Sequence, residues 1–360
     1  MKHIVCFHLY NDYSGSPTVL KMVLDGLLEK EVKIDLVTSK DGVLDEMENV
    51  NLKIYHYSYS FSTNPIVTMV RYIAIQIYTF FFAFKWIFDK DVIFYINTIL
   101  PIGPAISGRI MGKQVVYHYH ENAFAKSKFY KILAAGMQEI ANNVICVSQY
   151  QASFLKRKNN ISVIPNAVPQ KLVDKLNPDT EEAFKRKKVL MLGSLKQYKG
   201  TKEFTELAKT LQEYQFELVI NDTQENIDKF WKEKNIPQLN NLKIHPRQSD
   251  VSPFYNNASL VLNLSNKELA IETFGLTVLE AMSAGLPVIV PTVGGIAELV
   301  EDRVNGYKID VQDFDKIAEH IHKILTDKEL YISLSKNALE LSKKFDGNVM
   351  IDRIMSQLIK

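Results

Sequence analysis

Short apolar runs alternate with stretches of helical periodicity along the whole chain, and this alternation limits the fold more than any other feature. The runs expected to form strands lie at 3–9, 33–37, 91–96, 114–118, 143–147 and 161–164, and again at 188–192, 216–220, 242–245, 260–263 and 287–290. Strands that alternate with helices form parallel sheets with helices on both faces. The sequence therefore predicts an α/β fold with two doubly wound, Rossmann-like domains.

The length and the charge pattern indicate where the two domains meet. A chain of 360 residues suits two domains of ordinary size. Residues 165–169 have a turn-like composition, and residues 170–186 are highly charged without a strand pattern. We place the linker there, and expect a first domain over residues 1–168 and a second over residues 169–345.

Charge and cysteine content exclude several classes of protein. The 43 basic and 41 acidic residues give a net charge of only +2, so nucleic acid is not indicated as a partner. Cys6 and Cys146 each lie in an apolar run, which favours buried reduced thiols over a disulfide framework or a metal site. Together with the lack of a signal-peptide pattern at the N-terminus, this predicts a cytoplasmic protein.

Residues 268–290 are the most informative segment. Gly275 permits a tight turn, residues 276–284 have a helical pattern, and Gly285 and Pro287 end that helix. The amides of a helix entered through Thr273, Phe274, Gly275 and Leu276 favour a phosphate.

Two glutamates flank this turn, Glu272 in the loop and Glu280 in the helix. Their carboxylates suit the hydroxyl groups of a sugar and a ribose. The alternative is that Glu272 is a solvated loop residue and that Glu280 only complements the helix dipole.

Two further loops are expected to face phosphate. Residues 193–200, Gly-Ser-Leu-Lys-Gln-Tyr-Lys-Gly, follow a strand and offer amides together with the ammonium groups of Lys196 and Lys199, unless both lysines are merely solvated. Residues 13–17, which contain Gly15, could also approach a phosphate, although a plain turn capped by Ser16 fits equally well. The absence of three spaced glycines counts against a dehydrogenase.

A histidine pair ends another strand. His118 and His120 are expected on one face, where neutral imidazoles can bind a sugar or a phosphate. His118 could instead be structural, and a metal site would need a third ligand that the spacing does not supply. Asp89 and Asp91 have the spacing of a metal-binding Asp-x-Asp pair, but they lie just before a strand and are expected to form a turn, so we predict no metal site.

Phe274, Gly275 and Leu276 lie between the two glutamates, and Glu280 is followed by Ala-Met-Ser-Ala-Gly-Leu-Pro-Val-Ile. This segment resembles the Glu, seven residues, Glu signature of retaining GT-B glycosyltransferases of the family-4 type. The resemblance implies two domains facing across a cleft, with a C-terminal helix (346–360) packing back across both. It also implies that the first glutamate faces the donor sugar, the amides meet the diphosphate and the second glutamate holds the ribose.

Other positions carry the same resemblance. The family's loop has arginine after the first glycine and lysine before the last; here Ser194 follows Gly193, Lys199 matches, and Lys196 is the substitute for the missing arginine. His120, followed by an acidic residue, resembles the family's cleft histidine and is expected to contact the donor sugar or the acceptor. Ser148 resembles a family serine, with helix capping as the alternative. The resemblance also places the pair Gly294 and Gly295 near the sugar, with a plain glycine turn as the alternative.

The implied activity is a retaining, metal-independent, hexosyltransferase-like transfer from a UDP-sugar or a GDP-sugar to a saccharide acceptor, with no other cofactor. Lys199, Lys196 and loop amides would stabilise the departing diphosphate. Two alternatives stay open: a nucleotide-sugar epimerase or phosphorylase of the same architecture, and a catalytically weak, membrane-associated assembly factor, which the serine at position 194 suggests.

Residues 66–88 are unusually apolar and contain eight aromatic residues, with thirteen uncharged residues between Arg71 and Lys85, too few to span a bilayer. The alternatives are a buried helix and a membrane-surface helix. The second gains support from basic residues that only Glu139 opposes between 126 and 158, namely Lys126, Lys128, Lys131, Lys156, Arg157 and Lys158. We therefore expect peripheral binding to the cytoplasmic leaflet and a lipid-linked saccharide acceptor, as in surface polysaccharide biosynthesis.

Overall fold

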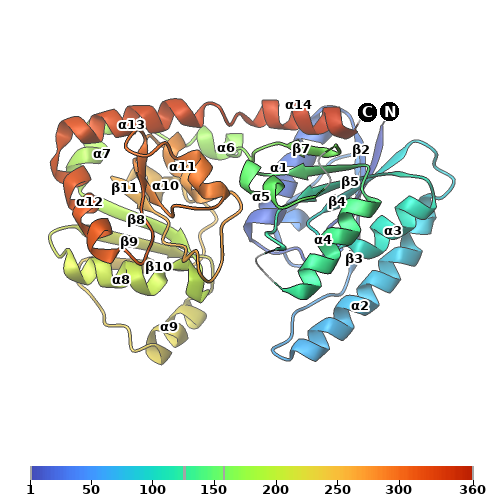
Figure 1. Ribbon diagram of the computed structural model, residues 1–360, viewed down its shortest axis with the longest axis horizontal. Helices are drawn as coiled ribbons and strands as arrows, with labels where there is room; N and C mark the ends of the chain where they lie inside the picture. The colour runs from blue at the N-terminus through green and yellow to red at the C-terminus, as the bar shows by residue number, and fades with distance from the viewer. Residues whose placement is uncertain (1, 125–126, 157–158, 359–360) are drawn as a thin grey trace. The chain divides into compact units, whose positions relative to one another are not determined.

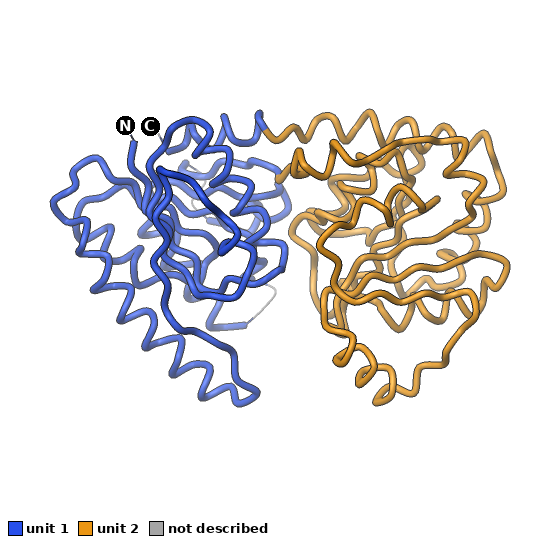
Figure 2. Tube along the Cα trace, turned by 180° about the vertical axis from the view of Figure 1, so that it is seen from behind, with its two compact units in different colours: residues 1–165, 348–360 blue, residues 166–347 orange. Residues whose placement is uncertain are grey.

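The computed structural model describes residues 2–124, 127–156 and 159–358, and it consists of two compact units (Figure 1). Unit 1 comprises residues 1–165 and 348–360, and unit 2 comprises residues 166–347 (Figure 2). The chain thus enters unit 2 before the charged stretch 170–186, which is not a linker. This stretch contains helices α6 (Gln170–Val173) and α7 (Thr180–Arg186). Ala183 of α7 is buried, and the charged residues occupy the solvent side of the helix.

Unit 1 is built on a parallel sheet of seven strands in the order β3-β2-β1-β4-β5-β6-β7. The strands are β1 (His3–Phe7), β2 (Lys33–Ser39), β3 (Leu52–Tyr57), β4 (Val92–Asn97), β5 (Gln114–Tyr119), β6 (Asn143–Cys146) and β7 (Ile161–Val163). The helices are α1 (Gly15–Glu29), α2 (Pro65–Phe82), α3 (Ile102–Ile110), α4 (Lys128–Ile140), α5 (Gln149–Ser153) and α14 (Gly347–Leu358), with single 3₁₀ turns η1 (Val43–Glu46) and η2 (Ala83–Trp86).

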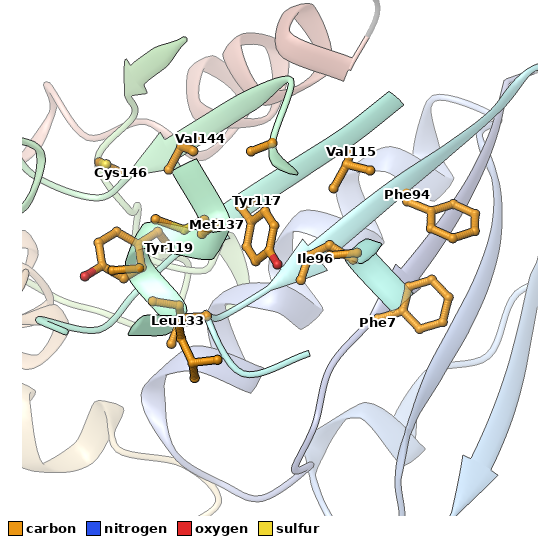
Figure 3. Packing of buried hydrophobic residues seen from close by; sticks show 14 of the residues in the cluster. Phe7, Phe94, Ile96, Val115, Tyr117, Tyr119, Leu133, Met137, Val144 and Cys146 are labelled. Atoms are coloured by element: carbon orange, nitrogen blue, oxygen red, sulfur yellow. The ribbon is translucent and has the colours of Figure 1, made fainter. Parts of the chain in front are cut away.

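The core of unit 1 lies between the central strands and the helices that cover them. Every residue of β1 and β4 is buried, as expected for strands covered on both faces. Figure 3 shows Phe7, Phe94, Ile96 and Tyr117 in one apolar cluster. Both cysteines are buried in this sheet, as the sequence predicts.

Helix α14 belongs to unit 1 although it follows unit 2 in the chain. Its buried residues include Ile351 and Ile354, and a side chain at Gly26 of α1 would collide with Ile351. The Gln357 side chain accepts hydrogen bonds from Asn143 at 2.7 Å and Ser162 at 3.0 Å. These contacts attach the C-terminal helix to the amino ends of β6 and β7.

Unit 2 is built on a parallel sheet of six strands in the order β10-β9-β8-β11-β12-β13. The strands are β8 (Lys188–Gly193), β9 (Gln215–Ile220), β10 (Leu242–His245), β11 (Leu260–Leu262), β12 (Val288–Val290) and β13 (Gly306–Lys308). The remaining helices are α8 (Thr201–Thr210), α9 (Gln224–Glu233), α10 (Ser252–Asn256), α11 (Leu276–Ser283), α12 (Phe314–Thr326) and α13 (Lys328–Ser342), with 3₁₀ turns η3 (Gln197–Lys199) and η4 (Gly295–Leu299).

Both sheets have a strand at which the winding reverses, and this confirms the predicted pair of doubly wound domains. In unit 1, β1 lies between β2 and β4; in unit 2, β8 lies between β9 and β11. At such a point the loops that follow neighbouring strands lead to opposite faces of the sheet, which leaves space for a ligand at the carboxyl edge. The loops after β8 and β11, and those after β1 and β4, are therefore the places where each unit can bind one.

Candidate functional site

The loop that follows β8 is pressed against the loop that follows β11. Gly200, between η3 and α8, has φ +75°, and a Cβ atom there would lie 2.4 Å from the backbone oxygen of Leu264. Only glycine fits this approach. The glycine at the end of the predicted phosphate loop thus brings Lys199 close to the residues that follow β11.

Lys199 forms an ion pair with Glu272, so the structure brings together two of the predicted site residues. The Ser265 hydroxyl donates a hydrogen bond to the same carboxylate oxygen at 3.0 Å. The side chains of Lys199 and Glu272 are 24% and 20% exposed, so both remain accessible to a small ligand.

Both members of this pair are charged at neutral pH. Burial acts to raise the pKa of Glu272, but the charge and hydrogen bond of Lys199 outweigh it and hold this pKa below its ordinary value. Burial likewise acts to lower the pKa of Lys199, and the Glu272 carboxylate reverses the effect and raises it. The exposed Lys196 also lowers the pKa of Glu272 through its charge.

The backbone of Glu272 is fixed by the glycine pair that follows β12. The Gly295 amide donates to the Glu272 carbonyl oxygen at 2.9 Å. Gly294 has φ +105°, and a Cβ atom there would lie 2.5 Å from that oxygen. The two glycines therefore allow a direct backbone contact that sets the position of the glutamate.

Helix α11 begins directly after this loop. Gly275 precedes the helix with φ +100°, and Gly285 follows it with φ +71°, as the sequence predicts for both turns. Phe274 is buried and packs edge-on against Phe345. The Val278 amide donates to the Gly275 carbonyl oxygen at 3.0 Å, and the amides of Leu276 and Thr277 at the start of the helix have no carbonyl partner within it. This end of α11 suits a phosphate group.

Glu280 lies in α11 as predicted, and its carboxyl group is buried against Tyr255 of α10. The Tyr255 hydroxyl lies 2.6 Å from a carboxyl oxygen of Glu280 and 3.2 Å from the Thr277 carbonyl oxygen. One hydroxyl proton cannot serve both acceptors. The contact with Glu280 is the shorter one, so the hydroxyl group donates mainly to Glu280, which lowers the pKa of this carboxyl group. Burial outweighs this hydrogen bond and raises the pKa of Glu280 to about 7.

Among the other predicted residues of the β8 loop, Gly193 ends the strand and Ser194 follows it. The Ser194 carbonyl oxygen accepts a hydrogen bond from the Thr201 hydroxyl at 3.1 Å. The Ser194 hydroxyl oxygen is buried and has no hydrogen-bond partner among the described residues. It is therefore a polar group that a ligand in this loop can satisfy.

In unit 1 a cluster of neutral histidines lies at the carboxyl ends of β1, β4 and β5. His120 Nε2 lies 3.0 Å from Asn97 Oδ1, and the Asn97 amide nitrogen lies 3.0 Å from His8 Nδ1. The rings of His118 and His120 are 4.2 Å apart, so they share one face as predicted. Burial lowers the pKa of His8 to about 4 and that of His118 to about 3, and it holds the pKa of His120 well below its ordinary value. These side chains are therefore neutral hydrogen-bonding groups.

The structure also places the other residues of unit 1 that the sequence singles out. Helix α1 begins at Gly15, so Ser16 lies inside the first turn and is not its cap; a Cβ atom at Gly15 would meet nothing within 4 Å. Ser148 caps α5 by accepting from the Gln151 amide at 3.1 Å. Asp89 accepts a hydrogen bond from His3 at 2.6 Å in the turn before β4. In the part of the chain that the structure describes, no three His, Cys, Asp or Glu side chains form a metal site.

Four residues that the sequence did not single out belong to these clusters: Tyr255, Ser265, His8 and Asn97. Ser265, His8 and Asn97 lie at or just after the carboxyl end of a strand next to the point where the winding reverses. Their position after these strands is the feature of the sequence that could have identified them. Tyr255 lies in a short helix outside any motif, and only the fold brings it to Glu280.

Two family models match the chain, one over each half. The model described as Glycosyltransferase Family 4 matches residues 13–171, and the model described as Glycosyl transferases group 1 matches residues 173–341. An uncharacterised glycosyltransferase of Haemophilus influenzae is 23% identical over 250 residues, which cover 67% of this chain and 68% of that protein. One of Methanocaldococcus jannaschii is 28% identical over 57% of this chain and 56% of that protein.

Other curated relatives are much longer than the stretch they share. A sucrose synthase of Denitrovibrio acetiphilus is 37% identical over 90 residues, which are 24% of this chain and 12% of that protein.

Among solved structures, the Anabaena protein HepE, in complex with UDP and glucose, superposes with a TM-score of 0.79 at 18% identity over 100% of both chains. Sucrose-phosphate synthase of Thermosynechococcus elongatus superposes with a TM-score of 0.76 at 17% identity over 99% of this chain and 98% of that chain. At these identities the similarity shows the fold.

Proposed function

Since this chain belongs to the GT-B glycosyltransferases, with a family-4 first half and a second half of glycosyl transferases group 1, we propose that it moves a sugar from a nucleotide-sugar to a saccharide acceptor with retention of the anomeric configuration. One observation supports this most. The Lys199–Glu272 pair lies between the β8 loop and the start of α11, at the edge of the sheet where doubly wound domains bind nucleotides.

The donor is assigned to unit 2. Its diphosphate would lie on the first amides of α11, with Lys199 and Lys196 offsetting the charge that develops on departure. The sugar would face Glu272, and the ribose would bind Glu280. HepE was crystallised with UDP-glucose, which supports a UDP-sugar ahead of a GDP-sugar. The acceptor is assigned to unit 1, with His120 as a contact to the acceptor or the donor sugar.

A thermal-shift screen tests the donor. A UDP-sugar at ~100 times its dissociation constant is expected to add roughly 2.7 kcal/mol to the free energy of unfolding. GDP-sugars and UDP alone, run in parallel, separate recognition of the base from recognition of the sugar. A screen in which no nucleotide-sugar raises the melting temperature would remove the basis of the assignment.

Transfer is expected to survive a chelator, because lysines and amides take the role that a metal ion has in other transferases. Lys199→Ala is expected to lower kcat by about 10²–10³, the usual cost of removing one preorganised group from developing negative charge. Ser194→Ala removes a hydroxyl group that makes no hydrogen bond within the described chain and should cost far less.

The matched control is Lys202→Ala, which removes an exposed lysine from the first turn of α8. Turnover should be compared in EDTA and in manganese for all four proteins. Loss of activity in EDTA with recovery in manganese would contradict the metal-independent mechanism and direct attention to Asp89 and Asp91.

An assay with and without added acceptor distinguishes sugar transfer from the two alternative functions, a nucleotide-sugar epimerase or phosphorylase and a catalytically weak assembly factor. Release of UDP that depends on added acceptor is expected for a transferase, whereas an epimerase, a phosphorylase or an assembly factor without catalytic activity would not show it.

We propose a lipid-linked saccharide as the acceptor, in surface polysaccharide biosynthesis at the cytoplasmic face of a membrane. Support comes from α2 of unit 1, whose exposed residues are apolar with the exception of Arg71.

A further inference from the structure

Helix α2 is amphipathic in the reverse of the usual sense. Its three buried residues are Tyr72, Gln76 and Thr79, which all carry polar groups. Its exposed side instead carries a row of large apolar side chains that are 49–73% exposed: Ile66, Val70, Ile73, Ile77 and Phe81. Their spacing of three or four residues places them on one face of the helix. A helix on a water-exposed surface has the opposite arrangement.

Polar contacts to the neighbouring helix fix this orientation. Gln76 accepts a hydrogen bond from the Gly103 amide at 2.9 Å, and a Cβ atom at Gly103 would lie 2.2 Å from the Gln76 carbonyl oxygen. The Tyr72 hydroxyl donates to the Leu100 carbonyl oxygen at 2.8 Å. Rotating α2 to bury its apolar row would break both hydrogen bonds. The outward apolar side is therefore part of the folded state.

The surface continues onto two more helices. α2 packs on α3, and α3 packs on α4, on one side of unit 1 (Figure 1). Exposed isoleucines extend the apolar row at Ile106 and Ile110 of α3 and at Ile132 of α4. We call the exposed residues of α2, η2, α3 and α4 the outer helical face.

The charged residues of the outer helical face are nearly all basic. Arg71, Lys85, Arg109, Lys128 and Lys131 are exposed on these elements, and the only exposed acidic residue among their described residues is Glu139. Lys156 is exposed after α5, whereas Lys126, Arg157 and Lys158 lie outside the described residues. A self-associating copy would bring these cations against one another. An anionic lipid surface complements them.

We propose that the outer helical face docks on an anionic membrane, with α2 lying in the plane of the lipid–water interface. α2 and η2 form one helical segment of 22 residues, Pro65–Trp86. By length and composition alone, this segment could cross a bilayer. The helix is therefore longer than the run of thirteen uncharged residues suggests. Its contacts favour the surface orientation, because the segment is attached along its length. Tyr72 and Gln76 bind the region of α3, and Trp86 donates to the buried Asp35 of β2 at 2.7 Å.

Vesicle co-sedimentation of the full chain tests this. The protein is expected to pellet with phosphatidylcholine vesicles that contain phosphatidylglycerol, and not with phosphatidylcholine alone. Ile73→Asp combined with Ile77→Asp should weaken binding at least about tenfold, since burying one such side chain already contributes about that factor. Lys128→Glu with Lys131→Glu should weaken it and reduce its dependence on salt. Val50→Asp is the matched control, since Val50 is a fully exposed apolar residue of unit 1 outside the elements that form this face.

Each outcome bears on the proposal. Melting curves and circular dichroism show whether the variants fold. Equal pelleting of wild type and the double aspartate variant, or no pelleting of wild type, would overturn membrane docking. A wild-type dimer that the aspartates dissociate, without vesicle binding, would assign the face to a second copy. Resistance to alkaline carbonate extraction would overturn the in-plane orientation. The test uses no nucleotide-sugar, so its failure leaves the proposed transfer unaffected.

Discussion

Glu272→Gln is expected to reduce sugar transfer by about 10²–10³ while the protein still folds and binds UDP, because it removes a fixed charge that faces the reacting sugar. Ser265 and the Gly294–Gly295 turn hold the carboxylate in place, and Lys199 keeps it ionised. Glutamine preserves the shape and the hydrogen bond to Ser265 but not the charge. Glu272→Ala, which also loses the hydrogen bond, should be at least as impaired.

The measurement is acceptor-dependent release of UDP, together with a UDP titration and a melting curve for each variant. Glu268→Gln is the matched control, because Glu268 is an exposed glutamate of the same loop. A selective loss of turnover with retained UDP binding separates a role at the sugar from a role at the nucleotide. Near-normal turnover in Glu272→Gln would falsify the assignment of this residue.

Glu280→Gln is expected to stabilise the ligand-free protein above neutral pH and to weaken nucleotide binding. Burial raises the pKa of Glu280 from 4.5 to about 7. Below the lower value the carboxyl group is protonated in both the folded and the unfolded chain, so it has no effect on the free energy of unfolding. Between the two values the unfolded chain loses the proton first, and each pH unit lowers the free energy of unfolding by about 1.4 kcal/mol. Above about pH 7 the whole penalty, roughly 3 kcal/mol, persists.

Glutamine cannot ionise and retains a hydrogen-bonding contact with Tyr255, so it avoids this penalty. Melting temperatures of wild type and Glu280→Gln should be similar near pH 5 and should diverge near pH 8, with the variant higher. Glu268→Gln should show no such divergence. If the melting temperatures of wild type and Glu280→Gln differ by the same amount at both pH values, burial does not raise the pKa of this carboxyl group.

The affinity for UDP, in contrast to the stability, should be lower in Glu280→Gln than in wild type. A ribose hydroxyl that donates to the Glu280 carboxylate contributes roughly 1.5–3 kcal/mol, so UDP should bind the glutamine variant about 10- to 150-fold more weakly. If the ribose instead binds elsewhere, the affinity for UDP would be unchanged.

The sequence predicts the fold well because buried parallel strands are continuous apolar runs. Eleven strands lie at the predicted places, with ends that differ by at most two residues. The two strands that it misses have weak patterns. β3 alternates apolar residues with Lys53 and His56 at the edge of its sheet, and β13 is three residues long and begins with Gly306. Neither has the run of buried residues on which the prediction depends.

The sequence predicts individual residues of the candidate site, but not which of them contact one another. Lys199 and Glu272 are 73 positions apart, and their contact depends on β8 lying next to β11, which no local pattern specifies. The raised pKa of Glu280 could not be predicted either, because it results from burial of the carboxyl group, which only the packing of α11 in the fold determines. Gly275 and Gly285 are predicted as turn residues, whereas Gly200 is predicted only as the end of a phosphate loop, and the close contact that it permits is visible only in the fold.

The path of the chain through unit 1 also determines the order in which the protein can be completed during synthesis. Unit 2 is one continuous stretch, so it can fold as soon as its residues leave the ribosome. Unit 1 must wait, because Ile351, Ile354 and Gln357 of α14 are translated after all of unit 2. Until then the side of α1 at Gly26 and the amino ends of β6 and β7 are uncovered. The nascent first unit therefore exposes apolar surface while the second is being made, and chaperones that bind such surfaces have that interval in which to act.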